Sequence, residues 1–583
     1  MLDSTYTRAR PAACLIAGAG DGPYGGGVDR SRTGVRLVAD VAHVVVLMLE
    51  NRSFDHMLGY LRHPDSAFDG LLGGGEFTNP GWVGAPAVAA SPQAKVVLPV
   101  GPDHSHDAVM EQLALTAAGE PTNQGFVVSY ERKGRGLDPP VFGGLLGSLL
   151  NWVRARFPGG EPPVTGRGPL VMSCQPPEQV PVLSRLASEF AVCTRWFCSV
   201  PGETWPNRNF AHAATSDGET AIEIRPYTNR TIFELLEEHG ADWRIYHDDT
   251  PQAWAFPALW DTADRHAKWF PLDRFAEHVA AGQLTAYTFI EPNHRPPLHT
   301  LDHAPLVGDP DLGSSQHPEN NLVSDGAYDT FRLRGESDFT RAERLIATIY
   351  EALRAHPHVF DRTVLLITYD EHGGLYDHVP PPTGVPSPGG QRSEVGRLMR
   401  ALLYRKASAF DFTMPGPRVP AVVVSPRVPA GTVDTQIHDH ASIPATLRAV
   451  FAPAAAPLTA RDAWSAPFNG LLTLPEARVD LPDLSAHATA LTAAVSTRPT
   501  AEALGVAEGA AEGVAEGEGE EAAASQTPAY YQSFTALAEQ VQQHLLAVGE
   551  PEAVGAQSAD TRVERSRQIS RTFAAAADRH RGS

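Results

Sequence analysis

Acidic and amide side chains follow two apolar segments of strand length. Glu50 and Asn51 come directly after 44–49, and Asp370 and Glu371 come directly after 363–369. Because ligands of parallel sheets bind beyond the carboxyl ends of the strands, we expect these four residues to meet. Three carboxylates in one place repel one another unless a cation joins them. Their oxygen atoms suit Mg²⁺, Ca²⁺ or Mn²⁺, and nearby histidines would also suit Zn²⁺ or Fe.

The alternative is that Glu50 and Asp370 only cap helices, as acidic residues at strand-to-helix turns often do. Two such sites in one chain, each with adjacent polar residues and histidines, favour the metal interpretation.

A hydroxyl group lies in a third polar segment, 199–208. This segment follows the apolar stretch 190–197 and precedes a helix-like stretch at 209–214. Thr204 is the candidate nucleophile, although a hydroxyl needs a base or a metal to react at neutral pH. Asn207 and Arg208 are candidates for contacts with an oxyanion, Arg208 through a bidentate pair of hydrogen bonds. A structural turn or a helix cap would explain the same residues.

The elements that must position these residues alternate between strand-like and helix-like patterns. Strand-like apolar runs occur at 44–49, 243–246, 287–290, 363–368 and 419–424. The segment 340–355 has an apolar stripe with helical spacing. Fully apolar strands alternating with helices predict an α/β fold with a central, mostly parallel sheet covered by helices on both faces.

Three motifs together resemble the bacterial phosphoesterase family, which contains phosphatidylcholine-hydrolysing phospholipases C and a class of acid phosphatases. They are ENRSFDH at 50–56, TWPNR at 204–208 and DEHGGLYDH at 370–378. Shorter matches occur at 103–107, 125–127, 179–197, 316–318, 419–426 and 439–443. The resemblance spans roughly 41–475. One departure is Thr194, where the family usually has aspartate after the cysteine, so Thr194 receives no role.

The resemblance implies an alkaline-phosphatase-like fold and a metal-dependent hydroxyl nucleophile. The implied metal ligands are Glu50, Asn51, Thr204, Asp370 and Glu371, with Thr204 also the nucleophile. The implied catalytic histidines, which hold the phosphate or serve the leaving group, are His106 and His317. Second choices among the histidines, each equally explained as structural, are His104, His294, His378 and His440. We expect the substrate-binding residues to be Asn51, Asn207, Arg208, His294 and His378.

Composition excludes some partners. The 583 residues contain 47 Lys and Arg against 68 Asp and Glu, for a formal charge of −21, which argues against nucleic acid. An anionic substrate remains compatible, since a bound metal reverses the local field. The four cysteines form no CxxC pair and are expected to be mainly free, buried thiols. No apolar run is long enough to span a membrane, and without a convincing signal peptide the expected location is cytoplasmic.

The predicted organisation has four parts: an N-terminal extension at 1–40, the phosphoesterase catalytic domain at 41–480, a linker rich in Ala, Glu and Gly at 481–530, and a C-terminal helical tail at 531–583. Within the linker, 501–525 contain seven Glu and no Lys or Arg. An amphipathic helix is expected at 531–548. The oligomeric state is left open.

The reaction expected from these residues is in-line displacement at phosphorus through a phospho-threonine intermediate on Thr204. The substrate is a phosphate ester, either a phospholipid-like diester or, as for an acid phosphatase, a monoester. Trp205, Trp196, Tyr376 and Phe54 either line an apolar mouth for a lipid or pack in the core. A sulfoester or phosphonate hydrolase, or a non-catalytic binding protein descended from an enzyme, would also be compatible with this fold.

Overall fold

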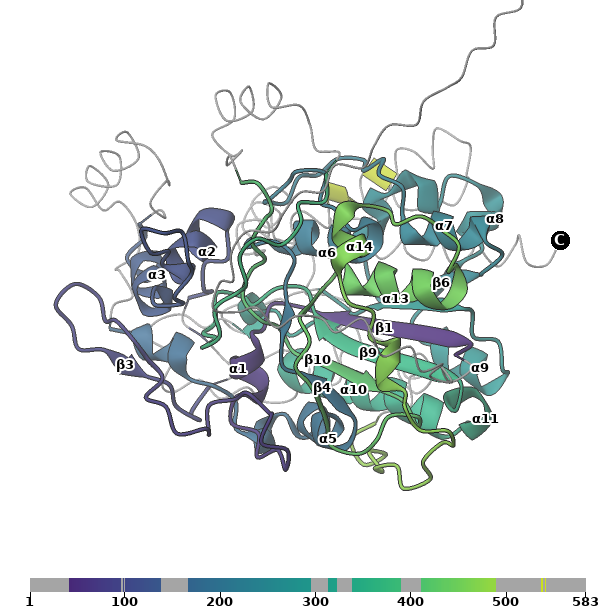
Figure 1. Ribbon diagram of the computed structural model, residues 1–583, viewed down its shortest axis with the longest axis horizontal. Helices are drawn as coiled ribbons and strands as arrows, with labels where there is room; N and C mark the ends of the chain where they lie inside the picture. The colour runs from purple at the N-terminus through teal and green to yellow at the C-terminus, as the bar shows by residue number, and fades with distance from the viewer. Residues whose placement is uncertain are drawn as a thin grey trace, which may run out of the picture. The chain divides into compact units, whose positions relative to one another are not determined.

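A sheet of eight strands forms the centre of the computed structural model, which describes residues 41–95, 98, 100–137, 166–294, 313–321, 338–389, 410–488, 536, 537, 540 and 541. The strand order is β11-β4-β10-β9-β1-β8-β6-β7 (Figure 1). The strands are β1 (His43–Leu49), β4 (Ala191–Cys193), β6 (Trp243–His247), β7 (Trp269–Pro271), β8 (Tyr287–Glu291), β9 (Thr363–Tyr369), β10 (Ala421–Val424) and β11 (Thr432–Asp434).

Most of this sheet is parallel. Strands β9, β1, β8, β6 and β7 run in one direction, and β11 is parallel to β4. Only β10 among these strands runs against its neighbours, β4 and β9. The strand order therefore places β1 and β9 side by side near the middle, where both carboxyl ends reach the same edge of the sheet.

Helices cover both faces of the sheet, as the apolar strands require. All seven residues of β9 are buried, so neither of its faces meets solvent. Figure 1 shows one group of helices on each side of the sheet. The first group is α5 (Pro181–Glu189), α9 (Arg274–Ala280), α10 (Asp338–Arg354) and α11 (Pro357–Phe360), and the second is α6 (Thr204–Ala213), α7 (Ile232–Glu238), α13 (Ser442–Phe451) and α14 (Ala460–Trp464).

A second, smaller core lies beside the segment that follows β9. Phe126 and Val171 pack there with Leu375 and Tyr376. The elements around it are α1 (Phe54–Leu58), β2 (Thr78–Asn79), β3 (Val88–Ala89), α2 (His106–Leu113), α3 (Phe126–Gly134) and the 3₁₀ helix η1 (Gly168–Met172). The remaining short elements are η2 (Pro177–Gln179), β5 (Trp196–Phe197), η3 (Gln252–Ala255), η4 (Pro257–Leu259), α8 (Ala263–His266), η5 (Pro318–Asn321), β12 (His438–Asp439) and η7 (Asn469–Leu471).

The predicted α/β class and the mostly parallel, doubly covered sheet are confirmed. The helix expected at 340–355 is α10, and its apolar stripe, which includes Ile346 and Tyr350, is buried. Cys174, Cys193 and Cys198 are free, buried thiols as expected, and Cys14 lies outside the described residues. No helix in the described part of the chain is long and apolar enough to cross a membrane.

Most of the predicted flanking parts lie outside the described residues. These are the extension at 1–40, the linker apart from 481–488, and the C-terminal tail apart from four residues. Those four are helical, and Leu537 and Val541 among them are buried. The boundaries of the four parts stay predictions.

Candidate active site

The carboxyl ends of β1 and β9 place Glu50 beside Asp370. Their register pairs Leu49 with Tyr369, so the next residue of each strand lies at the same level. The backbone N–H of Asn51 then donates to Asp370 Oδ1 at 3.1 Å, and that of Glu371 donates to the same oxygen at 2.7 Å. The side chains of all four polar residues are fully buried.

Neither acidic residue at these strand ends caps a helix. Helix α1 begins after Ser53, whose hydroxyl accepts from the His56 N–H. No helix occurs in 371–389, the described segment that follows Asp370. The capping alternative for Glu50 and Asp370 is therefore wrong, and their burial needs another explanation.

Thr204, the first residue of helix α6, lies near the end of β1. Its Oγ1 lies 3.5 Å from Asn51 Oδ1, and both side chains are buried. The expectation that the helix starts near Asn209 is wrong, because α6 begins at Thr204 itself. Pro206 is compatible with this earlier start, since the first turn of a helix needs no hydrogen bond from its N–H. The hydroxyl thus lies at a helix N-terminus, where backbone N–H groups and the helix dipole favour an anion.

The first turn of α6 is braced by Asn207. Its Oδ1 accepts from the Val200 N–H at 2.9 Å. Its Nδ2 donates to the carbonyl oxygens of Val200, Gly202 and Glu203 at 3.1, 3.3 and 3.1 Å. The side-chain amide is therefore engaged with the loop that leads to Thr204. Its predicted contact with a substrate stays a prediction.

Arg208 is directed at the carboxylates of the site. Its Nε donates to Asp370 Oδ2 at 3.0 Å, and one terminal nitrogen donates to Glu291 Oε2 at 3.2 Å. The other terminal nitrogen donates to the carbonyl oxygens of Met48 and Leu49. These contacts make the guanidinium a buried counter-charge between β1, β8 and β9. Its predicted contact with an oxyanion likewise stays a prediction.

Buried negative charge dominates the strand ends. Burial raises the pKa of Asp370 to about 8 against the opposing charge of Arg208, and burial also raises the pKa of Glu50. Burial alone would lower the pKa of His294, but Glu50 and Asp249 raise it to about 8. The His294 ring connects them, with Nδ1 3.0 Å from Asp249 Oδ1 and Nε2 3.8 Å from Glu50 Oε1.

These charges and polar atoms fit a divalent cation. Glu50, Asp370 and Glu371 are all buried, and a bound cation would offset the mutual repulsion that Arg208 leaves uncompensated. Glu371 Oε1 is buried and has no hydrogen-bond partner in the described part of the chain. The oxygen atoms of Asn51 and Thr204 complete a set that hard cations prefer. In the described part of the chain the three carboxylates do not all lie within 4.8 Å of one another, and their role with Asn51 and Thr204 as metal ligands stays a prediction.

Two histidines beside the site carry their protons on different nitrogens. His317 Nδ1 accepts from the Glu319 N–H at 3.1 Å, and burial lowers its pKa well below the usual value, so its proton lies on Nε2. His106 Nδ1 lies 2.6 Å from the Pro201 carbonyl oxygen, and burial lowers its pKa too. A carbonyl only accepts, so the neutral His106 keeps its lone pair on Nε2.

His104 packs edge-on against His317, with ring centroids 5.6 Å apart. Burial would lower its pKa, but Glu371 and other nearby carboxylates raise it above the usual value. His104 is therefore the more readily protonated member of the pair.

His440 supports the site through the backbone. Its Nε2 donates to the Asp370 carbonyl oxygen at 2.6 Å, and Nδ1 accepts from Trp196 Nε1 at 3.3 Å. Burial lowers its pKa to about 4, so the ring stays neutral.

His378 belongs to a different network. Its Nδ1 lies 2.6 Å from Asp55 Oδ2 and its Nε2 lies 3.1 Å from Asp69 Oδ1. These carboxylates raise the pKa of His378 to about 9 although burial opposes the shift. Arg418 donates to Asp55 and Asp377 in the same network. The contacts of His378 are thus not with the residues around Thr204, and its predicted role in substrate binding stays a prediction.

The four aromatic residues near the motifs pack in the core. Trp196, Trp205, Phe54 and Tyr376 are each at most 2% exposed. The alternative in which they line an open apolar mouth is therefore wrong, because each is packed among the buried residues of the two apolar cores.

Two buried carboxylates of the site were missed from the sequence. Glu291 follows the apolar run of β8 and pairs with Arg208, and Asp249 pairs with His294. The rule that identified Glu50 would have found Glu291, because it too stands where a central parallel strand ends.

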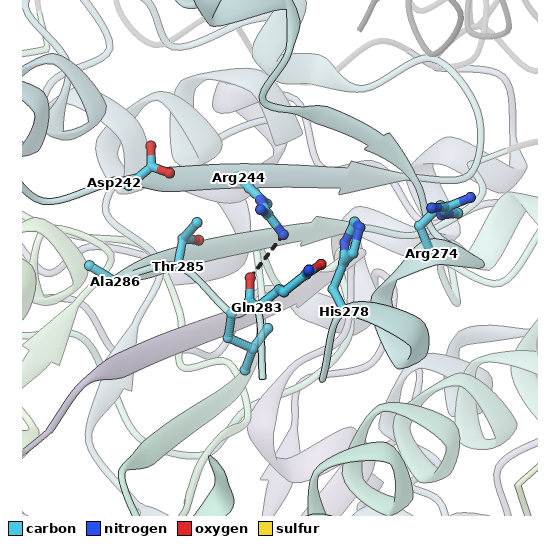
Figure 2. A pocket seen from close by; sticks show the side chains of 8 residues that line it. Asp242, Arg244, Arg274, His278, Gln283, Thr285 and Ala286 are labelled. Carbon is cyan, nitrogen blue, oxygen red and sulfur yellow. Dashed lines mark hydrogen bonds between the residues drawn. The ribbon is translucent and has the colours of Figure 1, made fainter. Parts of the chain in front are cut away.

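A surface pocket lies at the opposite end of the strands. Figure 2 shows Asp242 and Arg244 beside Thr285 and Ala286, at the amino ends of β6 and β8. The Arg244 guanidinium donates to the Gln283 carbonyl oxygen at 2.9 Å. Because parallel strands present their ligands at their carboxyl ends, this pocket is separate from the site of Thr204.

Comparison with known proteins identifies the family. The model of the phosphoesterase family matches residues 41–452. The chain belongs to the phosphoesterase family. Phosphoesterases similar to it include non-specific phospholipase C3 of Arabidopsis thaliana, which is 32% identical over 482 residues, 78% of this chain and 77% of that protein. Phospholipase C B of Mycobacterium tuberculosis is 29% identical over 459 residues, 73% and 76% of the two chains.

Solved structures similar to this phosphoesterase include a protein of the alkaline phosphatase superfamily from Vibrio parahaemolyticus. It is 10% identical, covers 46% of this chain and 60% of that chain, and gives a TM-score of 0.28. Family membership makes the chain a hydrolase of phosphoester bonds.

Proposed function

We propose that the chain is a metal-dependent, phospholipase C-like hydrolase in which Thr204 is the nucleophile. The observation that carries the proposal is the approach of Thr204, at the start of α6, to Asn51 beside the buried carboxylates of β1 and β9. A hydroxyl at a helix N-terminus next to a cation site suits attack on a phosphate ester, which carries negative charge.

The metal ligands of this proposal are Glu50, Asn51, Thr204, Asp370 and Glu371. The ion, one of Mg²⁺, Ca²⁺, Mn²⁺, Zn²⁺ or Fe, lowers the pKa of the nucleophilic hydroxyl and offsets charge on the phosphoryl oxygens when bound. Arg208 positions Asp370 and stabilises its ionised form, so the carboxylate is available as a ligand.

The chain's own groups carry the remaining steps. Thr204 Oγ1 releases its hydroxyl proton to solvent and attacks phosphorus while the bond to the leaving oxygen breaks, which gives a phospho-threonine and an alcohol. Protonated His104 donates the proton that the alcohol needs, while the Nε2–H of neutral His317 offers a hydrogen bond to the phosphoryl group. A water molecule then attacks the phospho-threonine, which releases the phosphate product and restores the Thr204 hydroxyl. The lone pair assigned to His106 Nε2 suits acceptance of the proton from that water.

The proposed substrate class is a phosphodiester with a lipid or choline group, supported by relatives named phospholipase C. Comparing p-nitrophenyl phosphorylcholine with p-nitrophenyl phosphate tests this choice. Faster turnover of the diester supports it. Faster turnover of the monoester would instead assign an acid phosphatase activity on the same site.

Thr204→Ala tests the nucleophile. We expect turnover to fall at least about 10³-fold, since a covalent step loses its attacking atom and the remaining site supplies only binding and electrostatic stabilisation. Metal content should fall less, because four of the five ligands remain. Acid-quenched wild-type enzyme should carry phosphate on Thr204 by mass spectrometry.

A matched control is Thr348→Ala. This threonine is also buried in a helix, where its hydroxyl donates to the Arg344 carbonyl oxygen, but it lies on α10 on the other side of the sheet. Its activity should stay near the wild-type value. Wild-type turnover by the Thr204 variant would overturn the nucleophile assignment, and full activity after complete metal removal by a chelator would overturn the metal requirement.

A further inference from the structure

A second set of metal-binding side chains lies away from the site of Thr204. Cys193 ends β4, Asp434 ends β11, and the parallel register of these strands pairs the two residues directly. His438 of β12 completes the group. The Cys193 sulfur, an Asp434 oxygen and a His438 nitrogen all lie within 4.8 Å of one another. In the part of the chain that the structure describes, no other three His, Cys, Asp or Glu side chains meet so closely.

The surrounding structure holds each side chain in place. Asp434 Oδ1 accepts from the Gln436 N–H at 2.9 Å, which directs Oδ2 at the His438 ring. Trp196 stacks on that ring with centroids 5.2 Å apart and planes 19° apart. Cys193 and His438 are fully buried, whereas the Asp434 side chain is 11% exposed. Ligands fixed in this way by strands and neighbouring contacts bind a metal with little reorganisation.

The ring contacts of His438 direct its Nε2 at Asp434. Its Nδ1 lies 3.0 Å from the Ala466 carbonyl oxygen, which only accepts, so Nδ1 carries a proton. The lone pair of Nε2 then faces Asp434 Oδ2 at 2.8 Å. These two atoms need only a small separation to become ligands of one metal ion. The Nδ1–H to carbonyl contact is also the outer contact that metal-bound histidines usually make.

We propose that Cys193, Asp434 and His438 bind a transition-metal ion, Zn²⁺ being the natural candidate. A thiolate, an imidazole and a carboxylate form a borderline-soft donor set that suits Zn²⁺ and is unlike the oxygen donors around Asp370. Three protein ligands leave the fourth position of a tetrahedral ion to water, which reaches the group from the exposed side of Asp434. Binding releases the Cys193 thiol proton to solvent.

The proposed ion would connect three strands that lead into the catalytic site. His440, two residues after His438, donates to the Asp370 carbonyl oxygen. The chain also runs from Cys193 through β5 (Trp196–Phe197) to Thr204. The role we assign to the ion is structural, because it would fix these two segments at one edge of the sheet. This proposal does not depend on the catalytic metal.

Titration of the metal-free, reduced full chain with Co²⁺ tests the site. Co²⁺ bound to a thiolate gives a near-ultraviolet charge-transfer band, whereas Co²⁺ on the oxygen ligands around Asp370 does not. We expect a band that saturates at one Co²⁺ per chain and that Zn²⁺ removes. Cys193→Ser should abolish the band. Cys198→Ser is the matched control, since that thiol is equally buried but contacts the Val200 carbonyl oxygen, and it should keep the band.

Two further measurements keep the test decisive if Cys193→Ser fails to fold. Asp434→Asn changes a partly exposed side chain and should weaken Co²⁺ binding about 100-fold or more. Zn²⁺ should also raise the thermal unfolding midpoint of the wild type more than that of Asp434→Asn. A wild-type chain without a charge-transfer band, or a band that persists in Cys193→Ser, would overturn the proposal and leave His438 and Asp434 as a proton-linked ion pair. The outcome of the Co²⁺ titration is separable from that of the nucleophile test, because these variants change neither Thr204 nor the other proposed ligands of the catalytic metal.

Discussion

Replacing Arg208 by Met should destabilise the metal-free chain in a way that depends on pH. The guanidinium is fully buried and makes hydrogen bonds to Asp370, Glu291 and two carbonyl oxygens. Removing one partner of a buried ion pair leaves the other charge uncompensated, which costs about 3–5 kcal/mol. Against an ordinary free energy of unfolding of about 5–15 kcal/mol, such a loss is large.

The sign of the pH dependence follows from Asp370. Its folded pKa of about 8 lies above its usual value of 3.8, so the folded state binds this proton more tightly than the unfolded state does. The associated stability is fully present below about pH 4 and is lost as the pH rises through about 8. Without Arg208 the folded pKa rises further. The deficit of the variant should therefore be larger at pH 8 than at pH 5.

Urea unfolding in the presence of a chelator measures this deficit at both pH values. Arg427→Met is a suitable control, because Arg427 pairs with Asp361 near the surface and its side chain is 19% exposed. Such a pair contributes about 1 kcal/mol or less. The reasoning is refuted if the Arg208 variant loses less than about 1 kcal/mol at pH 8, or if its deficit is the same at both pH values.

Three other substitutions probe the surroundings of Thr204 and the separate network of His378. Asn207→Ala should lower the free energy of unfolding by about 1–3 kcal/mol, measured with urea, because buried backbone groups lose their partners. By displacing Thr204 it should also lower kcat more than it raises KM, and an unchanged kcat would contradict the role of Asn207 in holding Thr204. His378→Gln should remove stability that is present below about pH 6.5 and lost as the pH rises through about 9. The free energies of unfolding of wild type and variant should therefore converge at alkaline pH, and an equal difference at pH 6 and pH 10 would contradict this role of His378. Gly373→Ala should cost more than about 1 kcal/mol and reduce metal content, since a Cβ at this φ of +67° would lie 2.2 Å from the Asn51 carbonyl oxygen; wild-type metal content would contradict that role.

The ends of the central strands were predictable from the sequence. A fully apolar run followed at once by acidic residues is typical of a buried central strand with polar residues at its carboxyl end. Glu50 and Asp370 were located by that rule. The direction of β10 was not predictable, since an apolar run of four residues reads the same in either orientation.

The contact partners of long side chains could also not be predicted from the sequence. Arg208 was expected near the substrate, but a guanidinium can reach any acceptor that the fold brings close, and here the nearest are buried carboxylates. The group of Cys193, Asp434 and His438 is another example. Cys193 precedes Asp434 and His438 by more than 200 positions, and only the pairing of β4 with β11 reveals that they meet.

The separation of Asn51 from Asp370 along the chain, 319 residues, has a consequence for biosynthesis. At a ribosomal rate of about 5–20 residues per second, β1 leaves the ribosome tens of seconds before its neighbour β9 exists. Strand β1 lacks both partners until β8 is made and lacks β9 for the rest of that interval, so its apolar faces and unpaired edges stay open to wrong pairings. The nascent chain also holds only part of the proposed cation ligands. Under the proposed mechanism, metal capture and hydrolytic activity would therefore begin together, late in synthesis, and any chaperone that protects β1 has to act before the second half of the catalytic domain appears.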